Sequence, residues 1–318
     1  MNAIEKNSRR MATLLEELAK LDGTRESPLD GVKLLRASCP VGRIPVMYEP
    51  SIVIVAQGRK RGFLGDQHFV YDAGHYLTLT VPLPFECETE VGEDGPFLGF
   101  AIRIDLAMLG ELVLCMGHST HLAAKPAEAR ESSVTATPID EALSDAAIRL
   151  LQAMRSPADA AVLGPQITRE ILYRVLCGRR GGALHSLLGM DSTRMQMHRI
   201  LHRMHTDYSR RLDVTKLAQE AGMSVSALHH HFKTLSGTSP LQYLKTVRLH
   251  KARMLMAQES LPASLAADRV GYESPSQFSR EFKRLFGFSP VEETQRMRAI
   301  FTPESSQPTT LPEWPGIS

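Results

Sequence analysis

The sequence has no apolar run long enough to cross a membrane. Its longest runs, such as Leu112–Met116, fall far short of the roughly 20 residues that a spanning helix needs. The first ten residues are polar and lack the apolar stretch of a secretory signal. The cysteines are few, widely spaced and without a CxxC pair, which argues against a disulfide framework or structural zinc. These absences predict a cytoplasmic protein with reduced thiols, no membrane contact and no cofactor.

A strong net charge is also lacking, but the charges are unevenly placed. The 318 residues carry a formal net charge of +2. From Arg194 to Ile300 there are 17 Lys and Arg against 9 Asp and Glu, so the rest of the chain is acidic. A basic C-terminal third predicts a polyanionic partner for that part alone. The length is sufficient for two or three domains, each with its own core.

The N-terminal half predicts a short helix followed by a β domain. Arg9–Leu21 has apolar residues at helical spacing and is followed by Gly23. From Leu34 to about Pro138, short alternating runs are separated by Pro and Gly, a texture typical of an antiparallel sandwich or barrel. The sequence Gly-Arg-Lys-Arg-Gly at 58–62 lies between two runs and predicts a solvated hairpin tip. The expected strands are Ile44–Tyr48, Ser51–Ala56, Gln67–Tyr71, His75–Val81 and Leu98–Ile104.

Helices follow the β domain. Residues 138–177 show apolar stripes interrupted at Ser156-Pro157 and Gly164-Pro165, and these stripes could pack on the β domain or against a second copy. The Gly-rich stretch at 178–182 indicates a linker. After Arg194 the pattern is helical almost to Ile300, and the Pro-rich end of the chain predicts a disordered tail.

The helical C-terminal third contains an internal repeat. Gly222 and Gly271 are 49 residues apart, whereas later matching positions are 50 apart, so the second unit has one extra residue. The positions 50 apart are Phe232 and Phe282, Lys233 and Lys283, Gly237 and Gly287, and Ser239-Pro240 and Ser289-Pro290.

Each repeat predicts a helix-turn-helix. The two glycines supply the positive φ that ends a helix and turns the chain sharply. Ser224 and Ser274 follow as N-cap candidates. Apolar i,i+4 pairs, Leu228 with Phe232 and Phe278 with Phe282, bury one face of the second helix and leave the other for a major groove.

Between the units, Leu241–Met256 predicts one connector helix. Its apolar stripe (Leu241, Leu244, Val247, Leu255) and its basic face (Lys245, Arg248, Lys251, Arg253) imply rigidity. Rigidity is needed because two recognition helices can enter successive major grooves only when held about 34 Å apart.

The tandem units, the connector and the closing Phe-Lys-Arg-Leu-Phe-Gly-Phe-Ser-Pro at 282–290 resemble the DNA-binding domain of the AraC/XylS family of bacterial regulators. Upstream, the segments at 48–52, 55–60, 71–76 and 81–84 resemble the cupin-like N-terminal domain of that family. The resemblance implies an α+β multidomain protein with a β-barrel and a C-terminal all-α domain. The expected organisation is a helical arm at 1–30, a cupin-like barrel at 31–137, dimerisation helices at 138–178, a linker at 179–193, the DNA-binding domain at 194–300 with helix-turn-helix units at about 214–235 and 262–286, and a tail at 301–318.

The family resemblance also assigns DNA-contacting residues. Carried over by position, base contacts fall on Ser226, His229 and His230 in the first unit and on Ser276, Gln277, Ser279 and Arg280 in the second. Lys233, Lys283 and Arg284 are expected to contact phosphates. The first recognition helix offers histidines and small residues where long polar or aromatic side chains are common in the family. Neutral histidine reads bases less strongly than arginine reads guanine, so we expect the second unit to supply much of the base readout.

Histidines raise the question of metal. The adjacent residues His229, His230 and His231 point about 100° apart on a helix and cannot chelate together. His198, His202 and His205 share one helix face and could hold zinc only with a further ligand, which the sequence nearby does not supply. The cupin HxH pattern is absent: His68, His75, His118 and His121 are scattered. No metal or catalytic residue is expected.

From the repeated units we expect a regulator that binds double-stranded promoter DNA, and from the helices at 138–178 a homodimer. Because most members of the family activate transcription by touching RNA polymerase, the resemblance implies an activator that contacts RNA polymerase. Whether a small-molecule effector controls it stays open, and the residues that would bind one are unknown. Two alternatives remain: a cupin-type metalloenzyme with a DNA-binding tail, and a ligand-independent architectural DNA binder. A barrel core filled with bulky side chains would count against an effector there.

Overall fold

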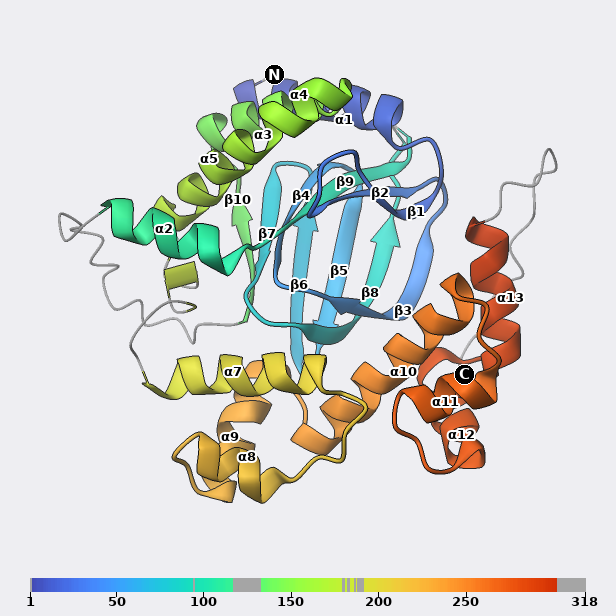
Figure 1. The fold of residues 1–318 in the computed structure, drawn as a ribbon. Coiled ribbons are helices and arrows are strands. Elements are labelled where there is room, and N and C mark those ends of the chain that lie inside the picture. The colour runs from blue at the N-terminus through green and yellow to red at the C-terminus, as the bar shows by residue number, and fades with distance from the viewer. Residues whose placement is uncertain are drawn as a thin grey trace.

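The computed structural model describes most of the chain as a sheet domain and a helical domain, one above the other (Figure 1). The described residues are 2–93, 95–116, 133–178, 181, 184–185, 187 and 192–301. The expected α+β architecture is confirmed, because an antiparallel barrel-like pair of sheets precedes an all-helical C-terminal part. No helix within these described ranges is long and apolar enough to cross a membrane.

In the described residues, ten strands form two antiparallel sheets that face each other. One sheet has the order β1-β2-β9-β4-β7-β10 and the other β3-β8-β5-β6. All five predicted strands are present, with ends shifted by a few residues at most. The strands are β1 (Gly23–Glu26), β2 (Val32–Ala37), β3 (Val41–Tyr48), β4 (Ser51–Gln57), β5 (Arg59–Leu64), β6 (Gln67–Asp72), β7 (His75–Leu79), β8 (Leu83–Glu90), β9 (Phe97–Arg103) and β10 (Val134–Pro138).

The predicted hairpin tip at 58–62 is wrong. Only Gly58 turns, with a φ of +78°, and the next residues form β5, which pairs with β6 and β8. Arg59 and Arg61 form ion pairs with Asp72 and Glu90 on the neighbouring strands. The basic run was read as a solvated turn because charge alone does not reveal acidic partners that lie across a sheet.

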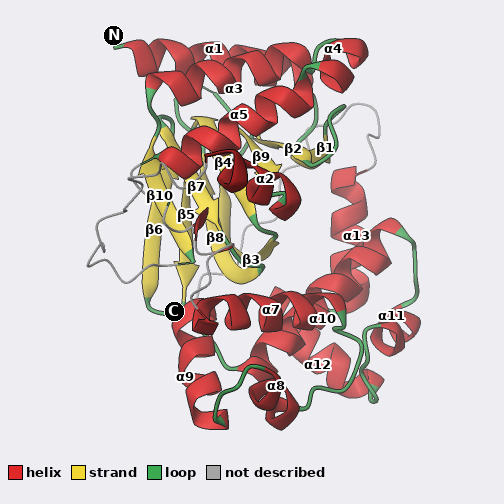
Figure 2. Cartoon of the chain, turned by 60° about the vertical axis from the view of Figure 1, so that its left-hand side comes forward, coloured by secondary structure: helices red, strands yellow, loops and turns green. Residues whose placement is uncertain are grey.

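Helices cover the outer face of the six-stranded sheet (Figure 2). The helix predicted at Arg9–Leu21 begins earlier, because Asn2 and Glu5 form a capping box, and it ends at Leu18. A helix at Leu106–Met116 was not expected within the β region. The helices of this part are α1 (Ala3–Leu18), α2 (Leu106–Met116), α3 (Glu141–Ala153), α4 (Pro157–Val162) and α5 (Gly164–Cys177).

The apolar stripes of residues 138–177 pack on the chain's own sheet. Leu143, Leu150, Ile171 and Val175 are buried in one core with sheet residues such as Ile54. Of the two packing modes left open by the sequence, the structure therefore shows the one within the chain.

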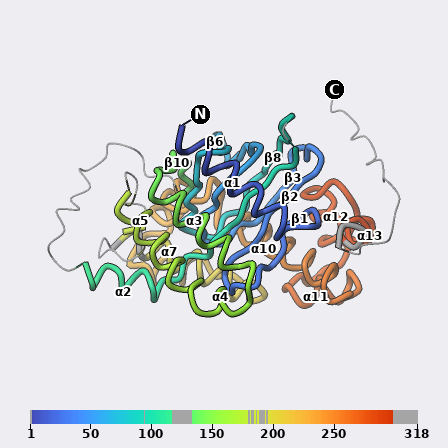
Figure 3. The backbone as a smooth tube through the Cα atoms, turned by 90° about the horizontal axis from the view of Figure 1, so that it is seen from above, coloured from blue at the N-terminus to red at the C-terminus, as the bar shows by residue number. Residues whose placement is uncertain are grey.

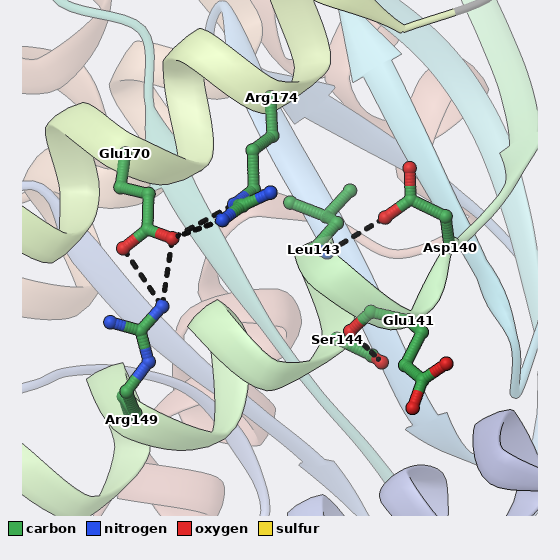
Figure 4. A network of polar contacts seen from close by, with 7 residues as sticks. All are labelled: Asp140, Glu141, Leu143, Ser144, Arg149, Glu170 and Arg174. Carbon is green, nitrogen blue, oxygen red and sulfur yellow. Dashed lines mark hydrogen bonds and ion pairs between the residues drawn. The ribbon is translucent and has the colours of Figure 1, made fainter.

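A polar network fastens α3 to α5 (Figure 4). Glu170 lies between two arginines and accepts hydrogen bonds from Arg149 at 2.8 Å and from Arg174 at 2.7 Å. These hydrogen bonds lower the pKa of Glu170, the Arg149 contribution being the largest, while burial opposes them. Asp140 caps α3 by accepting from the Leu143 amide. The helices α3 and α5 are thus joined to each other as well as to the sheet.

The C-terminal helices lie beneath the open end of the sheets, with α11–α13 on the side opposite α2 and α5 (Figures 1 and 3). The predicted linker lies mostly, and the tail almost wholly, outside the described residues. The helices are α7 (Ser192–Thr206), α8 (Val214–Glu220), α9 (Val225–Ser236), α10 (Pro240–Gln258), α11 (Ala263–Arg269), α12 (Pro275–Phe286) and α13 (Pro290–Phe301).

Candidate nucleic-acid interface

The two helix-turn-helix units repeat the same backbone hydrogen bonds. In the first turn, Gly222 N donates to Gln219 O at 3.0 Å and Met223 N donates to Ala218 O at 2.9 Å. In the second, Gly271 N and Tyr272 N donate to the corresponding carbonyls of Asp268 and Ala267, both at 2.9 Å. Both glycines have positive φ, +60° and +86°. The internal repeat predicted from spacing is therefore also a repeat of structure.

The recognition helices α9 and α12 begin and end alike. Ser224 and Ser274 cap them by accepting from the amide three residues on, at 3.2 Å each. Because both serines are caps, the extra residue of the second unit is Glu273 in the turn. Gly237 and Gly287 end the helices with φ of +71° and +81°. The predicted apolar pairs Leu228 with Phe232 and Phe278 with Phe282 are fully buried.

Every predicted DNA-contacting side chain lies on the exposed face of its recognition helix. The exposed residues are Ser226, His229, His230 and Lys233 on α9 and Ser276, Gln277, Ser279, Arg280, Lys283 and Arg284 on α12. Each face is thus accessible to solvent. On α12, four side chains line a hollow of about 370 Å³: Gln277, Arg280, Glu281 and Arg284.

Glu281 organises the second recognition helix, and the sequence analysis missed it. Its carboxylate accepts from Lys245 Nζ at 2.7 Å, Tyr272 Oη at 2.7 Å and Gln277 Nε2 at 3.1 Å. Burial alone would raise the pKa of Glu281, but the three hydrogen bonds outweigh it and lower the pKa. The available signal was an acid four residues after Gln277 in an otherwise basic helix. One predicted base-contacting side chain is thereby held in place.

The connector α10 is a single helix, as predicted, but its basic face is not a free cationic surface. Arg248 donates to the carbonyls of Tyr208, Arg210 and Gly271 at 2.7 to 2.9 Å. Lys245 pairs with Glu281, and Arg253 pairs with Glu293 at 2.7 Å. Leu241, expected in the apolar stripe, is 55% exposed. Arg248 therefore joins the segment before α8 to the second turn, while Lys245 and Arg253 hold α12 and α13 to the connector.

The two units are unequal in their packing. Leu228 and Phe232 of the first unit share one continuous core with residues from between the sheets, such as Phe97. Phe278 and Phe282 of the second unit pack in a separate core with α10. Two hydrogen bonds reinforce the first contact, from Ser133 Oγ to Leu235 O and from Tyr243 Oη to Pro82 O at 2.8 Å.

The space between the sheets is occupied by side chains. Val53, Tyr71, Leu77 and Phe97 are at most 1% exposed there. Lys60 also reaches this interior, with Nζ 3.4 Å from Tyr48 Oη and 4.9 Å from the centre of the Phe97 ring. Because bulky side chains fill this core, the structure counts against an effector between the sheets.

Among the histidines considered as metal ligands, His205 is buried and His75 is bonded to a carboxylate. Both ring nitrogens of His205 are buried without a hydrogen-bond partner, and burial lowers its pKa to about 4. His75 bonds to Asp72, while His118 and His121 lie outside the described residues. Within the described part of the chain no group of three or more His, Cys, Asp or Glu could hold a metal ion.

Two family models match the chain. The AraC-type transcriptional regulator N-terminus matches residues 28–183, and a helix-turn-helix domain matches residues 217–296.

Curated relatives match over part of their length. The transcriptional activator RclR of Escherichia coli K12 is 39% identical over 87 residues, 27% of this chain and 31% of RclR. The regulator GlxA of Rhizobium meliloti is 38% identical over 91 residues, 29% of this chain and 28% of GlxA. The activator RhaS of Escherichia coli O1:K1 / APEC is 27% identical over 143 residues, 45% of this chain and 51% of RhaS. The chain thus spans about a third to a half of the length of these relatives.

Solved structures of ToxT from Vibrio cholerae share the fold. ToxT with a bound unsaturated fatty acid has a TM-score of 0.55 at 13% identity, covering 83% of this chain and 94% of that one. ToxT bound to a naphthalenyl-butenoic acid has a TM-score of 0.57 at 12% identity, covering 83% and 99%. At these identities the likeness concerns the arrangement of the two domains.

Proposed function

The chain belongs to the AraC-type family of transcriptional regulators, and we propose that it binds double-stranded promoter DNA in a sequence-specific manner. The observation that supports this most is the pair of matching helix-turn-helix units on one rigid connector, each with an exposed polar recognition helix. Two such helices held by one connector are suited to successive major grooves. Lysines and arginines on the same faces would supply salt-dependent affinity for the backbone.

We propose that the two units contact DNA through the residues expected from the sequence. In the first unit, bases are contacted by Ser226, His229 and His230. Ser276, Gln277, Ser279 and Arg280 contact bases from the second, and Lys233, Lys283 and Arg284 bind phosphates. The fixed position of Gln277 beside Glu281 supports a leading part for the second unit, since a pre-positioned side chain loses less entropy on binding.

Replacing Arg280 with Ala tests the assignment. We expect a loss of about 1–3 kcal/mol at one operator base pair and a relaxed preference there. Lys283→Ala is the matched control, because it should weaken binding to all sequences and reduce the salt dependence instead. Binding is measured on a set of single-base operator variants at two salt concentrations. An unchanged base preference in the Arg280 variant would contradict the assignment.

We propose that the protein acts as an activator that contacts RNA polymerase in the cytoplasm. The names of RclR and RhaS as activators support the direction of regulation. The relatives are regulators, which gives the metalloenzyme alternative no support.

We also propose that two copies of the chain form a homodimer through residues 138–178. Because the main apolar stripes pack on the sheet, the surface for a second copy would have to use the exposed side chains of this segment, Val162, Leu163 and Tyr173.

A further inference from the structure

The segment at 208–211, which connects α7 to α8, lies between the two helix-turn-helix units (Figure 1). Arg248 of the connector donates to the carbonyl of Gly271 in the second turn at 2.8 Å and to that of Arg210 at 2.9 Å. A Cβ on Gly271 would lie 2.2 Å from Ser209 O, so the segment and the second turn touch through their backbones. Its other end leads into α8 of the first unit. The segment therefore occupies the middle of the DNA-binding domain.

This segment carries two adjacent cations, Arg210 and Arg211. Both are exposed, and neither side chain forms an ion pair with any residue that the structure describes. The acids nearest to them in the sequence, Asp207 and Asp213, each pair with another basic side chain at 3.9 Å. Two neighbouring charges of the same sign repel each other, and an anionic partner relieves that repulsion.

The position between the units determines which part of the DNA the segment would meet. Recognition helices that enter successive major grooves on one DNA face have a minor groove between them on that face. The segment at 208–211 is the loop between the first two helices of this domain. In homeodomains the loop between the first two helices contacts the DNA backbone, so a loop at this place is within reach of DNA. Arginine is attracted by the negative potential of a narrow, A·T-rich minor groove.

We propose that Arg210 and Arg211 bind in the minor groove between the two major-groove segments and make the protein select an A·T-rich centre in its operator. This inference rests on the proposed function, because it adds a third contact to the same DNA complex. The recognition helices read base edges by hydrogen bonds, whereas the arginine pair selects by groove width. Because Arg248 already fixes the backbone of the segment, little ordering of the chain is needed on binding.

The test begins with duplexes that the full-length protein selects from a random-sequence library, each with two half-sites. The base pairs midway between the half-sites are then made A·T, G·C or inosine·C. Inosine lacks the amino group that guanine places in the minor groove, while its major-groove edge is that of guanine. We expect A·T and inosine·C centres to bind about tenfold more tightly than G·C centres. Equal binding of the three centres would overturn the inference.

Two double variants locate the readout. Arg210→Ala with Arg211→Ala should lose the central preference and keep base discrimination within the half-sites. Arg210→Lys with Arg211→Lys keeps the charge, but an ammonium is more strongly hydrated than a guanidinium. The lysine variant should therefore keep the salt dependence of binding and lose most of the central preference.

Two further variants are controls. Arg280→Ala, on the second recognition helix, should keep the central preference, and Lys20→Ala, at an exposed cation of the N-terminal part, should change neither preference nor affinity. A wild-type central preference in the double alanine variant would overturn the inference. Complete rescue by lysine would identify the two residues as phosphate contacts and overturn the minor-groove assignment.

The selection step separates this inference from the proposed function. Selected duplexes with two half-sites but no preference between them would overturn the inference and leave the proposed function standing. If the wild-type protein enriched no sequence from the library, the proposed function itself would be overturned, and this inference with it.

Discussion

Among single residues, Glu281 and the buried histidines have pKa values that their surroundings lower. Glu281 is an acid on a helix that we propose faces DNA, where an acid with no other role would be unfavourable. Its three hydrogen bonds from Lys245, Tyr272 and Gln277 explain its presence, because they fix α12 to α10 and orient Gln277. In the proposed complex with DNA it is a positioning residue, because it acts through Gln277.

Replacing Glu281 with Gln should reduce base discrimination at the pair contacted by Gln277 and destabilise the second unit by about 1–3 kcal/mol. Glu273→Gln is the control, since it removes an exposed acid from the same unit. It should strengthen binding to all sequences through reduced repulsion. Operator-variant binding and urea unfolding measure the two effects. If both variants behave alike, Glu281 acts only through its charge.

His205 makes stability depend on pH. Its folded pKa of about 4 lies below the usual 6.5 because it is buried, with Lys251 adding to the effect. Between pH 6.5 and 4 the unfolded chain therefore binds more protons than the folded chain, and stability falls as the pH falls. One such group contributes at most about 1.4 kcal/mol per pH unit.

The variant His205→Phe should flatten this acid-side slope in part. His250, whose pKa is about 3, contributes in the same direction and remains. The free energy of urea unfolding at pH 7, 6 and 5 gives the slope. A slope equal to that of the wild type would show that His205 is hydrated in solution.

At the scale of elements, the two turns look alike in sequence but differ in what surrounds them. A Cβ built on Gly222 meets nothing within 4 Å, whereas one on Gly271 would lie 2.2 Å from Ser209 O. Gly271 O also accepts from Arg248 of the connector. The second turn is therefore closely packed against the segment before α8, and the first is open.

We expect Gly222→Ala to cost about 1–2 kcal/mol, the strain of a left-handed alanine. Gly271→Ala should cost at least roughly twice as much, because backbone must move as well. Urea unfolding measures the free-energy cost of each substitution. Near-UV circular dichroism or NMR monitors the loss of packing in the α12 core. Equal costs would show that the Ser209 segment yields easily.

Elements also show where a sequence pattern was sufficient. Leu228 and Phe232 predicted a buried helix face because i,i+4 spacing is local. The strand at 59–64 was missed because its charged residues pair with Asp72 and Glu90 on other strands. Arg248 was assigned to a basic face, since its carbonyl partners lie 23 to 40 residues away.

At the scale of the whole molecule, one continuous core includes both the side chains between the sheets and those of the first helix-turn-helix unit. The barrel is not an independent domain, since its interior residues share a core with α7, α9 and α10. The second unit has its own core and reaches the barrel through α10 and α12. A change in the barrel would therefore reach the first unit through the shared core, and the second unit through the connector and through the contact of α12 with β3.

Removing the Tyr243 hydroxyl tests this contact. Tyr243→Phe leaves the buried Pro82 carbonyl without its donor, so we expect a loss of about 1–3 kcal/mol and easier opening between the domains. Tyr173→Phe, at an exposed site, is the control and should have no effect on opening. Limited proteolysis and hydrogen exchange of α9 and α10 measure opening. Unchanged protection in the Tyr243 variant would contradict a stabilising role for this bond.

The sequence by itself determined the two repeated units, their caps, their buried pairs and the exposed faces proposed to meet DNA. Those features depend on residues within a few positions of one another, and helical periodicity makes them readable. Tertiary structure alone decided that the stripes of residues 138–177 pack inward, that the barrel shares its core with the first unit among the described residues, and that Glu281 binds Lys245 of the connector. It also placed the segment of Arg210 and Arg211 between the two units. Each of these depends on contacts between segments far apart in the chain, which no local spacing encodes.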